Sequence, residues 1–180
     1  MTAFQDTAQE QQRLDWLLLR HGAIALYHRS DVLAGDIAWL RAQRYRVHEL
    51  NLASCHGAEQ FYQEVQRLLG SPNRYGANFA AFLDCLGDLE VPAEAGTAIV
   101  FRRYDVFARG DARLAQLVLD AIESASRHQL LFGRRLIALA QSDDPRIRFE
   151  AVGARPVNWN PREWLDETRP PRGAGSVRAF

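Results

Sequence analysis

The chain has 180 residues, 47% of them hydrophobic, which is enough to bury one core with a small appendage. Its net charge of zero at pH 7 argues against a general nucleic-acid binder. No apolar run approaches about eighteen residues, and no basic start precedes an apolar run. We therefore expect a cytoplasmic protein with neither a membrane span nor a signal peptide.

The first part of the chain alternates between helical and extended patterns. In order, the patterns fit a short docking helix, a buried strand, a helix and a second strand over residues 6–19, 22–28, 31–43 and 45–52. Ser30 or Asp31 is expected to cap the second of these helices. A strand, a helix and a strand in succession predict a parallel unit with a right-handed crossover.

Two further helices are predicted next. Residues 57–69 have apolar side chains at helical spacing and are ended by Gly70-Ser71-Pro72. In the stretch 74–89, Gly76 and Asn78 suit a tight turn or an N-cap, and one helix face is apolar, with Phe79, Phe82, Leu83 and Leu86. Asp84 and Asp88 are four residues apart, so they lie together on the surface of that helix.

The second half of the chain continues the alternation. It predicts a strand, a helix capped by Asp111 and another strand over residues 98–101, 111–129 and 134–140. Residues 147–152 are compatible with an edge strand, and Asn160 is placed to cap a final helix whose tryptophans close the core. The whole pattern predicts an α/β fold with a small, mainly parallel β-sheet packed with helices.

The stretch 74–89 resembles the core signature of the barstar family of intracellular ribonuclease inhibitors. The matching residues are Tyr75-Gly76, Asn78 and Asp84-Cys85, followed by Leu86. The resemblance covers about residues 45–142 and implies a barstar-like domain there. Around it we expect an N-terminal extension packed on the main domain, a C-terminal extension and a flexible tail, over residues 1–44, 143–168 and 169–180.

The resemblance also implies a function without catalysis or a cofactor. In barstar the aspartate at the position of Asp84 enters the phosphate-binding site of the ribonuclease. We therefore expect an immunity protein that occludes a toxin enzyme, with a nuclease as the expected class. The expected partner-binding residues are Asp84, Asp88, Arg74, Tyr75, Asn78, Ala80, Leu83 and Glu123.

This chain departs from the barstar pattern at several contact positions. Ala80 stands where barstar has a second contacting aspartate. Aromatic contacts of barstar are replaced by Arg74, Leu83 and Leu89. A carboxylate is lost and a positive charge is gained, so we expect barnase-type ribonucleases not to be the main target.

Catalytic and metal-binding patterns are weak. The five histidines have no metal-ligand spacing, and no glycine-rich phosphate loop is present. Cys55 and His56 are adjacent in sequence, whereas catalytic pairs usually meet in space, and Asp143-Asp144-Pro145 fits a turn. Cys55 and Cys85 are expected to be free, buried thiols, since two cysteines make no disulfide framework.

An alternative is a non-catalytic scaffold or an RNA-binding module. From residue 126 onward ten arginines face six acids, a net charge of +4, and arginines there interleave with Trp159 and Trp164. Basic and aromatic side chains together are typical of a stacking platform for single-stranded nucleic acid. By contrast, residues 55–125 carry ten acids and six arginines, a net charge of −4, which suits a cationic partner.

Overall fold

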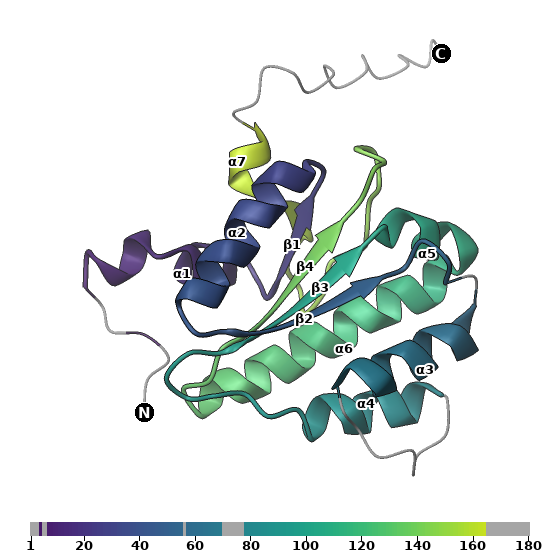
Figure 1. Ribbon diagram of the computed structural model, residues 1–180, viewed down its shortest axis with the longest axis horizontal. Coiled ribbons are helices and arrows are strands. Elements are labelled where there is room, and N and C mark those ends of the chain that lie inside the picture. Colours follow the sequence, from purple (N-terminus) through teal and green to yellow (C-terminus); the bar gives the residue numbers. More distant parts are fainter. Residues whose placement is uncertain (1–3, 5–6, 56, 70–77, 165–180) are drawn as a thin grey trace.

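The computed structural model describes residues 4, 7–55, 57–69 and 78–164. In these ranges the chain forms one five-stranded sheet in the order β2-β3-β4-β1-β5, with every neighbouring pair parallel (Figure 1). The strands are β1 Ile24–Tyr27, β2 Arg46–Asn51, β3 Thr97–Arg102, β4 Leu136–Gln141 and β5 Asn158–Trp159. The predicted parallel α/β fold is therefore confirmed.

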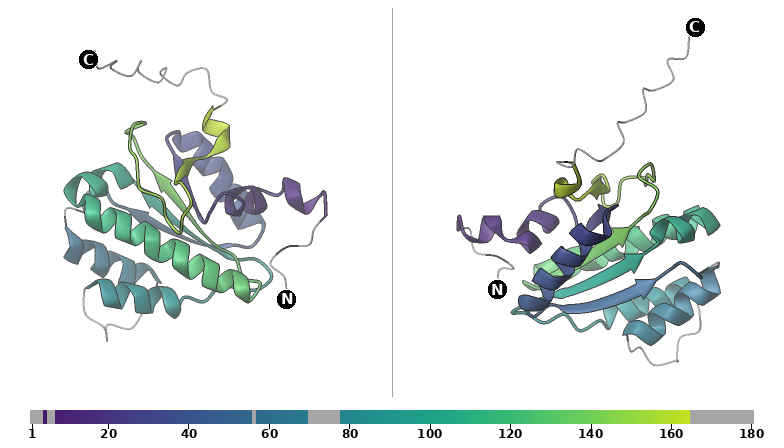
Figure 2. Two further views of the ribbon diagram at one scale, coloured as in Figure 1. Left: turned by 180° about the vertical axis from the view of Figure 1, so that it is seen from behind. Right: turned by 45° about the horizontal axis from the view of Figure 1, so that its top comes forward.

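Helices cover both faces of the sheet (Figures 1 and 2). On one face lie the short η1 and two helices: η1 Glu10–Gln12, α1 Leu14–Leu19 and α2 Ser30–Ala42. On the other face lie α3 Ala58–Leu69, α4 Phe79–Gly87, α5 Tyr104–Gly110 and α6 Ala112–Leu131. The last helix, α7 Pro161–Trp164, follows β5 beside the α2 layer.

The central strands are mostly apolar because each of their faces is covered. All six residues of β4 are buried. Alternation along the strand places Ile137 and Leu139 in the core under α1 and α2, and Ala138 in the core under α3 to α6. The sheet thus separates two hydrophobic cores.

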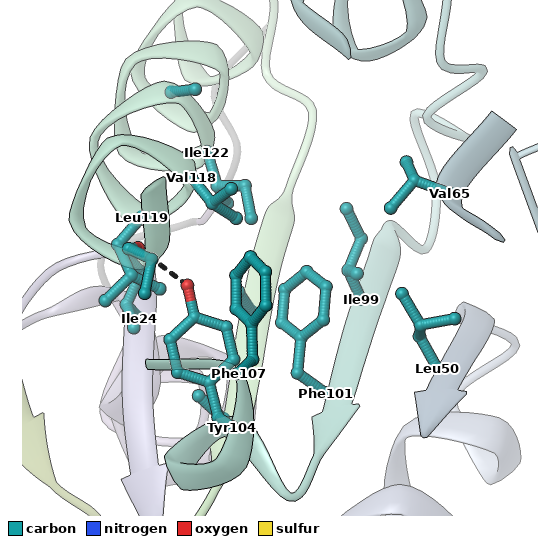
Figure 3. Packing of buried hydrophobic residues seen from close by; sticks show 14 of the residues in the cluster. Ile24, Leu50, Val65, Ile99, Phe101, Tyr104, Phe107, Val118, Leu119 and Ile122 are labelled. Atoms are coloured by element: carbon teal, nitrogen blue, oxygen red, sulfur yellow. Dashed lines mark hydrogen bonds between the residues drawn. The ribbon is translucent and has the colours of Figure 1, made fainter. Parts of the chain in front are cut away.

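Aromatic rings fill the larger core, between β3, α3 and α5. Phe61 and Phe107 stack with centroids 4.7 Å apart, and Tyr104 packs edge-on against Phe107 at 5.7 Å. The buried Tyr104 hydroxyl donates to the Ala115 carbonyl at 2.7 Å, so its polar atom is satisfied (Figure 3). Aromatic packing holds α5 and α6 on the sheet at this position.

Several local predictions need correction. Residues 147–152 form no strand: Gln116 Oε1 accepts from Glu150 N–H at 3.0 Å, so an α6 side chain takes the bond that a strand neighbour would take. The edge strand that this part of the chain contributes is β5 instead, beside β1. The helix α5 was not predicted, because the turn before it uses a left-handed Arg103 (φ 59°), where sequence rules look for glycine.

The start of α2 also differs from expectation. Neither Ser30 nor Asp31 caps it. The carboxylate Oε1 of Glu163, on α7, accepts from the N–H groups of His28 and Arg29, both at 3.1 Å. A buried acid more than a hundred residues away along the chain therefore satisfies the amides that precede this helix.

The remaining caps follow the sequence. Asp111 Oδ1 accepts from Leu114 N–H at 2.9 Å at the start of α6. Asn160 Oδ1 accepts from Arg162 N–H at 3.0 Å, so Asn160 caps α7 as predicted.

The first two strands of the predicted parallel unit, β1 and β2, are parallel but not adjacent, because β3 and β4 lie between them in the sheet.

Candidate functional site

The candidate partner surface is built on α4. Asn78 caps the helix: its Oδ1 accepts from Ala81 N–H at 2.9 Å, as its position in the sequence predicted. The buried face consists of Ala81, Phe82, Cys85 and Leu86. It packs against α3 and α6, and the helix is thereby fixed as a rigid element.

Five residues form the exposed face of α4, which we call the α4 face: Ala80, Leu83, Asp84, Gly87 and Asp88. The structure corrects the predicted apolar face here, because Leu83 is 45% exposed while the buried side is completed by Ala81 and Cys85. Four of the eight expected partner-binding residues are thus brought together on one surface.

The two aspartates of the α4 face differ from other exposed acids in their electrostatic surroundings. Within the described ranges, neither carboxylate forms a hydrogen bond or an ion pair with another residue. Acids nearby are neutralised by arginines: Glu90 pairs with Arg46 at 2.9 Å and Glu64 with Arg67 at 2.6 Å. Exposed carboxylates on a rigid helix are free to accept hydrogen bonds from cationic groups.

Glu123 does not belong to this surface. Its carboxylate is 3% exposed, and Oε2 accepts from the Ala23 N–H at 2.7 Å while Oε1 pairs with Arg127 at 3.1 Å. The group satisfies an amide just before β1 and links α6 to it. We therefore correct the expectation that Glu123 contacts a partner: both of its oxygens are occupied inside the fold.

Two further expected partner-binding residues, Arg74 and Tyr75, lie outside the described residues. Leu89, at the position of an aromatic barstar contact, is buried and belongs to the core under α3 to α6.

A cavity that the sequence did not predict adjoins the α4 face. It has a volume of about 290 Å³ and lies between α4 and α6. Its α6 wall consists of three small residues at helical spacing and two larger polar ones: Ala121, Ser124, Ala125, His128 and Gln129. The spacing of these small residues is the one sequence pattern that could have indicated the cavity. Small residues on a helix fit close packing against a neighbouring helix equally well.

Chemistry of other kinds is poorly supported. Among the described residues no group of three or more His, Cys, Asp or Glu could hold a metal ion. Cys55 and Cys85 are free and buried, as predicted, and burial raises the pKa of the Cys55 thiol, which disfavours a nucleophilic thiolate. None of the described helices is long and apolar enough to cross a membrane.

The Arg/Trp segment does not form the stacking platform of the alternative interpretation. Trp159 lies in β5 and is 8% exposed, so its ring is part of the core under α3 to α6. Arg162 is turned inward to pair with the buried Asp36. A base could not stack on Trp159 without opening the edge of the sheet.

Comparison with known proteins agrees with the fold. A family model described as Barstar (barnase inhibitor) matches residues 45–142, more than half of the chain. The match spans β2, α3, α4, β3, α5, α6 and β4, and leaves out α1, β1, α2 and the segment containing β5 and α7. No individual curated protein matches the chain.

Proposed function

This chain belongs to the barstar family, and from that premise we propose that it is an immunity protein that binds a toxin enzyme of the nuclease class in the cytoplasm. The α4 face occludes the active site of that enzyme. The protein itself carries out no reaction, in keeping with a family described as inhibitors.

One observation carries the proposal: Asp84 and Asp88 are exposed, and no described residue pairs with either carboxylate. A nuclease binds substrate phosphates through cations and amide donors, and carboxylates satisfy the same donors. Two acids one helical turn apart present adjacent negative groups, as a phosphate chain does.

Rigidity strengthens this mode of inhibition. The helix that carries Asp84 is capped by Asn78 and fixed by buried Phe82 and Leu86, so the backbone loses little freedom on binding. The helix body then blocks the approach of RNA or DNA. Inhibition follows from occupancy of the site and needs no chemical change in either partner.

The test is a direct inhibition assay. The gene neighbouring that of this chain is examined for a basic enzyme that is toxic when expressed alone, and this enzyme is purified together with wild-type protein and two variants. We expect stoichiometric loss of nuclease activity with wild type, a marked loss of inhibition for Asp84→Ala, and full inhibition for Asp31→Ala. Asp31 is an exposed acid on α2, in the opposite layer.

Two results would overturn the proposal. One is an enzyme that stays fully active with an excess of folded wild-type protein. The other is a salt-sensitive shift of RNA by the protein alone, dependent on residues 143–180, which would favour the RNA-binding alternative.

A further inference from the structure

Most of the large apolar side chains that are exposed in the described part of the chain lie on α4, on α6 or directly after α6. Among the described residues five large hydrophobic side chains are exposed, and four of them belong to α4, α6 or the residue after α6: Leu83, Leu117, Leu131 and Phe132. Phe132 is 57% exposed, and its ring packs edge-on against His128 with centroids 5.2 Å apart.

Leu83 borders the cavity between α4 and α6, which we call the α4–α6 groove, and so does His128, which the Phe132 ring contacts. Leu83 and Gly87 line it from α4, and Ala121, Ala125 and His128 line it from α6. The volume of about 290 Å³ is at the lower limit for a small-molecule site. It suits a single large side chain better than a ligand that must bury most of its own surface.

The groove and the aspartates occupy opposite flanks of the same helix. At about 100° per residue, Leu83 lies on the flank toward α6, and Asp84 and Asp88 lie on the other flank. Between them the α4 face carries only Ala80 and Gly87, which are small enough to let a partner approach the helix axis closely. One partner element lying across α4 would therefore meet carboxylates on one side and an apolar groove on the other.

We propose that the α4–α6 groove receives one large apolar side chain of the enzyme that the α4 face inhibits, a proposal that rests on the function given above. The occupant follows from charge complementarity: the unpaired aspartates select a partner with cations, and the groove selects an apolar side chain about one helix width from them. The groove would supply specificity, because an enzyme that has the cations but no apolar side chain to fill the groove would bind less tightly.

Glycine at position 87 permits a sharp test. A Cβ added to Gly87 meets no atom within 4 Å, so Gly87→Gln fills the mouth of the groove without a clash. Gly35, exposed on α2 in the opposite layer, is equally open, and Gly35→Gln is the matched control. Both changes replace a helical glycine with a better helix former, so neither is expected to unfold the protein.

The first probe is N-acetyltryptophanamide, titrated into labelled protein and followed by amide chemical shifts. We expect shifts clustered at Leu83, Ala125 and His128 for wild type and Gly35→Gln, and their loss in Gly87→Gln. Dispersed shifts, or an unchanged pattern in Gly87→Gln, would overturn the assignment of the groove as an apolar site.

The second probe is the toxin nuclease from the inhibition assay, catalytically inactivated. We expect Gly87→Gln to weaken binding by about tenfold to a hundredfold, the range for burying one large apolar side chain, and Gly35→Gln to bind within twofold of wild type. Equal binding by both glycine variants while Asp84→Ala fails would overturn the groove and leave the proposed function standing.

If the proposed function is wrong, the two probes give a different combination of results. If wild type does not bind the enzyme but the amide probe still maps to the groove, the proposed function and the enzyme as occupant both fall. Light scattering identifies the remaining candidate: a wild-type dimer that Gly87→Gln dissociates would make a second copy of this chain the occupant and overturn the proposal.

Discussion

Asp84 and Glu123 are acids on neighbouring helices of one layer, and burial gives them opposite roles. Asp84 is exposed and unpaired among the described residues, so it retains its capacity for a partner. Glu123 is buried, and its two carboxylate oxygens accept hydrogen bonds from Ala23 N–H and Arg127 Nε. A carboxylate contributes to binding or to folding according to whether its hydrogen bonds are already made.

The first prediction is that Asp84→Ala separates binding from stability. The side chain is on the surface and away from the cap at Asn78, so unfolding by urea should change by about 0.5 kcal/mol or less. Affinity for the cognate enzyme should fall by about 2–5 kcal/mol, because the cations of the enzyme lose their partner. Calorimetry that finds binding within twofold of wild type would show that this docking mode is not used.

The second prediction is that Glu123→Ala lowers stability and leaves binding unchanged. Removing the carboxylate leaves the buried Ala23 N–H without its acceptor, which should cost about 1–3 kcal/mol in the free energy of unfolding. Affinity for the enzyme, measured on the folded fraction, should match wild type. A loss of affinity equal to that of Asp84→Ala would place Glu123 at the interface after all.

At the scale of whole elements, α1 is joined to the sheet by a buried ion cluster. Asp15 of α1 has no exposed surface and accepts hydrogen bonds from Tyr45 Oη at 2.6 Å, Arg135 Nη1 at 3.0 Å and Arg13 Nη2 at 2.9 Å. Burial alone raises the pKa of Asp15, but hydrogen bonds from Arg13 and Tyr45 outweigh it, so the pKa lies below its ordinary value.

The third prediction follows from that lowered pKa. A carboxyl whose folded pKa is depressed contributes stability above its unfolded value of about 3.9, and that stability is lost as pH falls through the folded pKa. Asp15→Asn should lower the free energy of unfolding by about 3–5 kcal/mol near pH 7, because Arg135 is left buried without a charge partner. The difference from wild type should shrink as pH falls below about 4.

A matched variant makes this prediction specific. Glu59→Gln, at an exposed position of α3, should leave both the stability near pH 7 and its acid dependence close to wild type. Denaturant unfolding at several pH values measures both quantities. A constant difference between Asp15→Asn and wild type from pH 7 to pH 3 would contradict the linkage.

For the molecule as a whole, the distribution of charge matters more than its sum. The net charge is zero, so long-range attraction of a basic enzyme must come from local carboxylates such as those of the α4 face. Compared with barstar, that face has Ala80 in place of an aspartate and Leu83 in place of an aromatic contact. The recognised enzyme should therefore differ from barnase.

The fourth prediction concerns that difference. Titration of a barnase-type ribonuclease with this protein should give poor inhibition, since one carboxylate is missing at Ala80 and the sequence has a positive charge, Arg74, where barstar has an aromatic contact. Stoichiometric inhibition at nanomolar concentrations would mean that the departures from the barstar pattern carry little energy. Barstar itself serves as the positive control.

The sequence alone determined the elements whose signals are local. The helices α3, α4 and α6 and the strands of the central sheet follow from apolar periodicity, and the caps at Asn78, Asp111 and Asn160 act within three residues. The barstar resemblance of the stretch around Asp84 likewise needs only neighbouring residues. These features were predictable because a short segment contains everything that specifies them.

Tertiary structure decided what depends on residues far apart in the chain. The burial of Glu123, the edge pairing of β5 and the amide contacts of Glu163 before α2 each require a partner from another element. Leu83 is exposed because the neighbouring helices leave it uncovered. Helical spacing states which side chains share a face, but it does not state which neighbour covers that face. The α4 helix thus presents Asp84 on one flank and the groove on the other, because the packing of α6 leaves Leu83 uncovered.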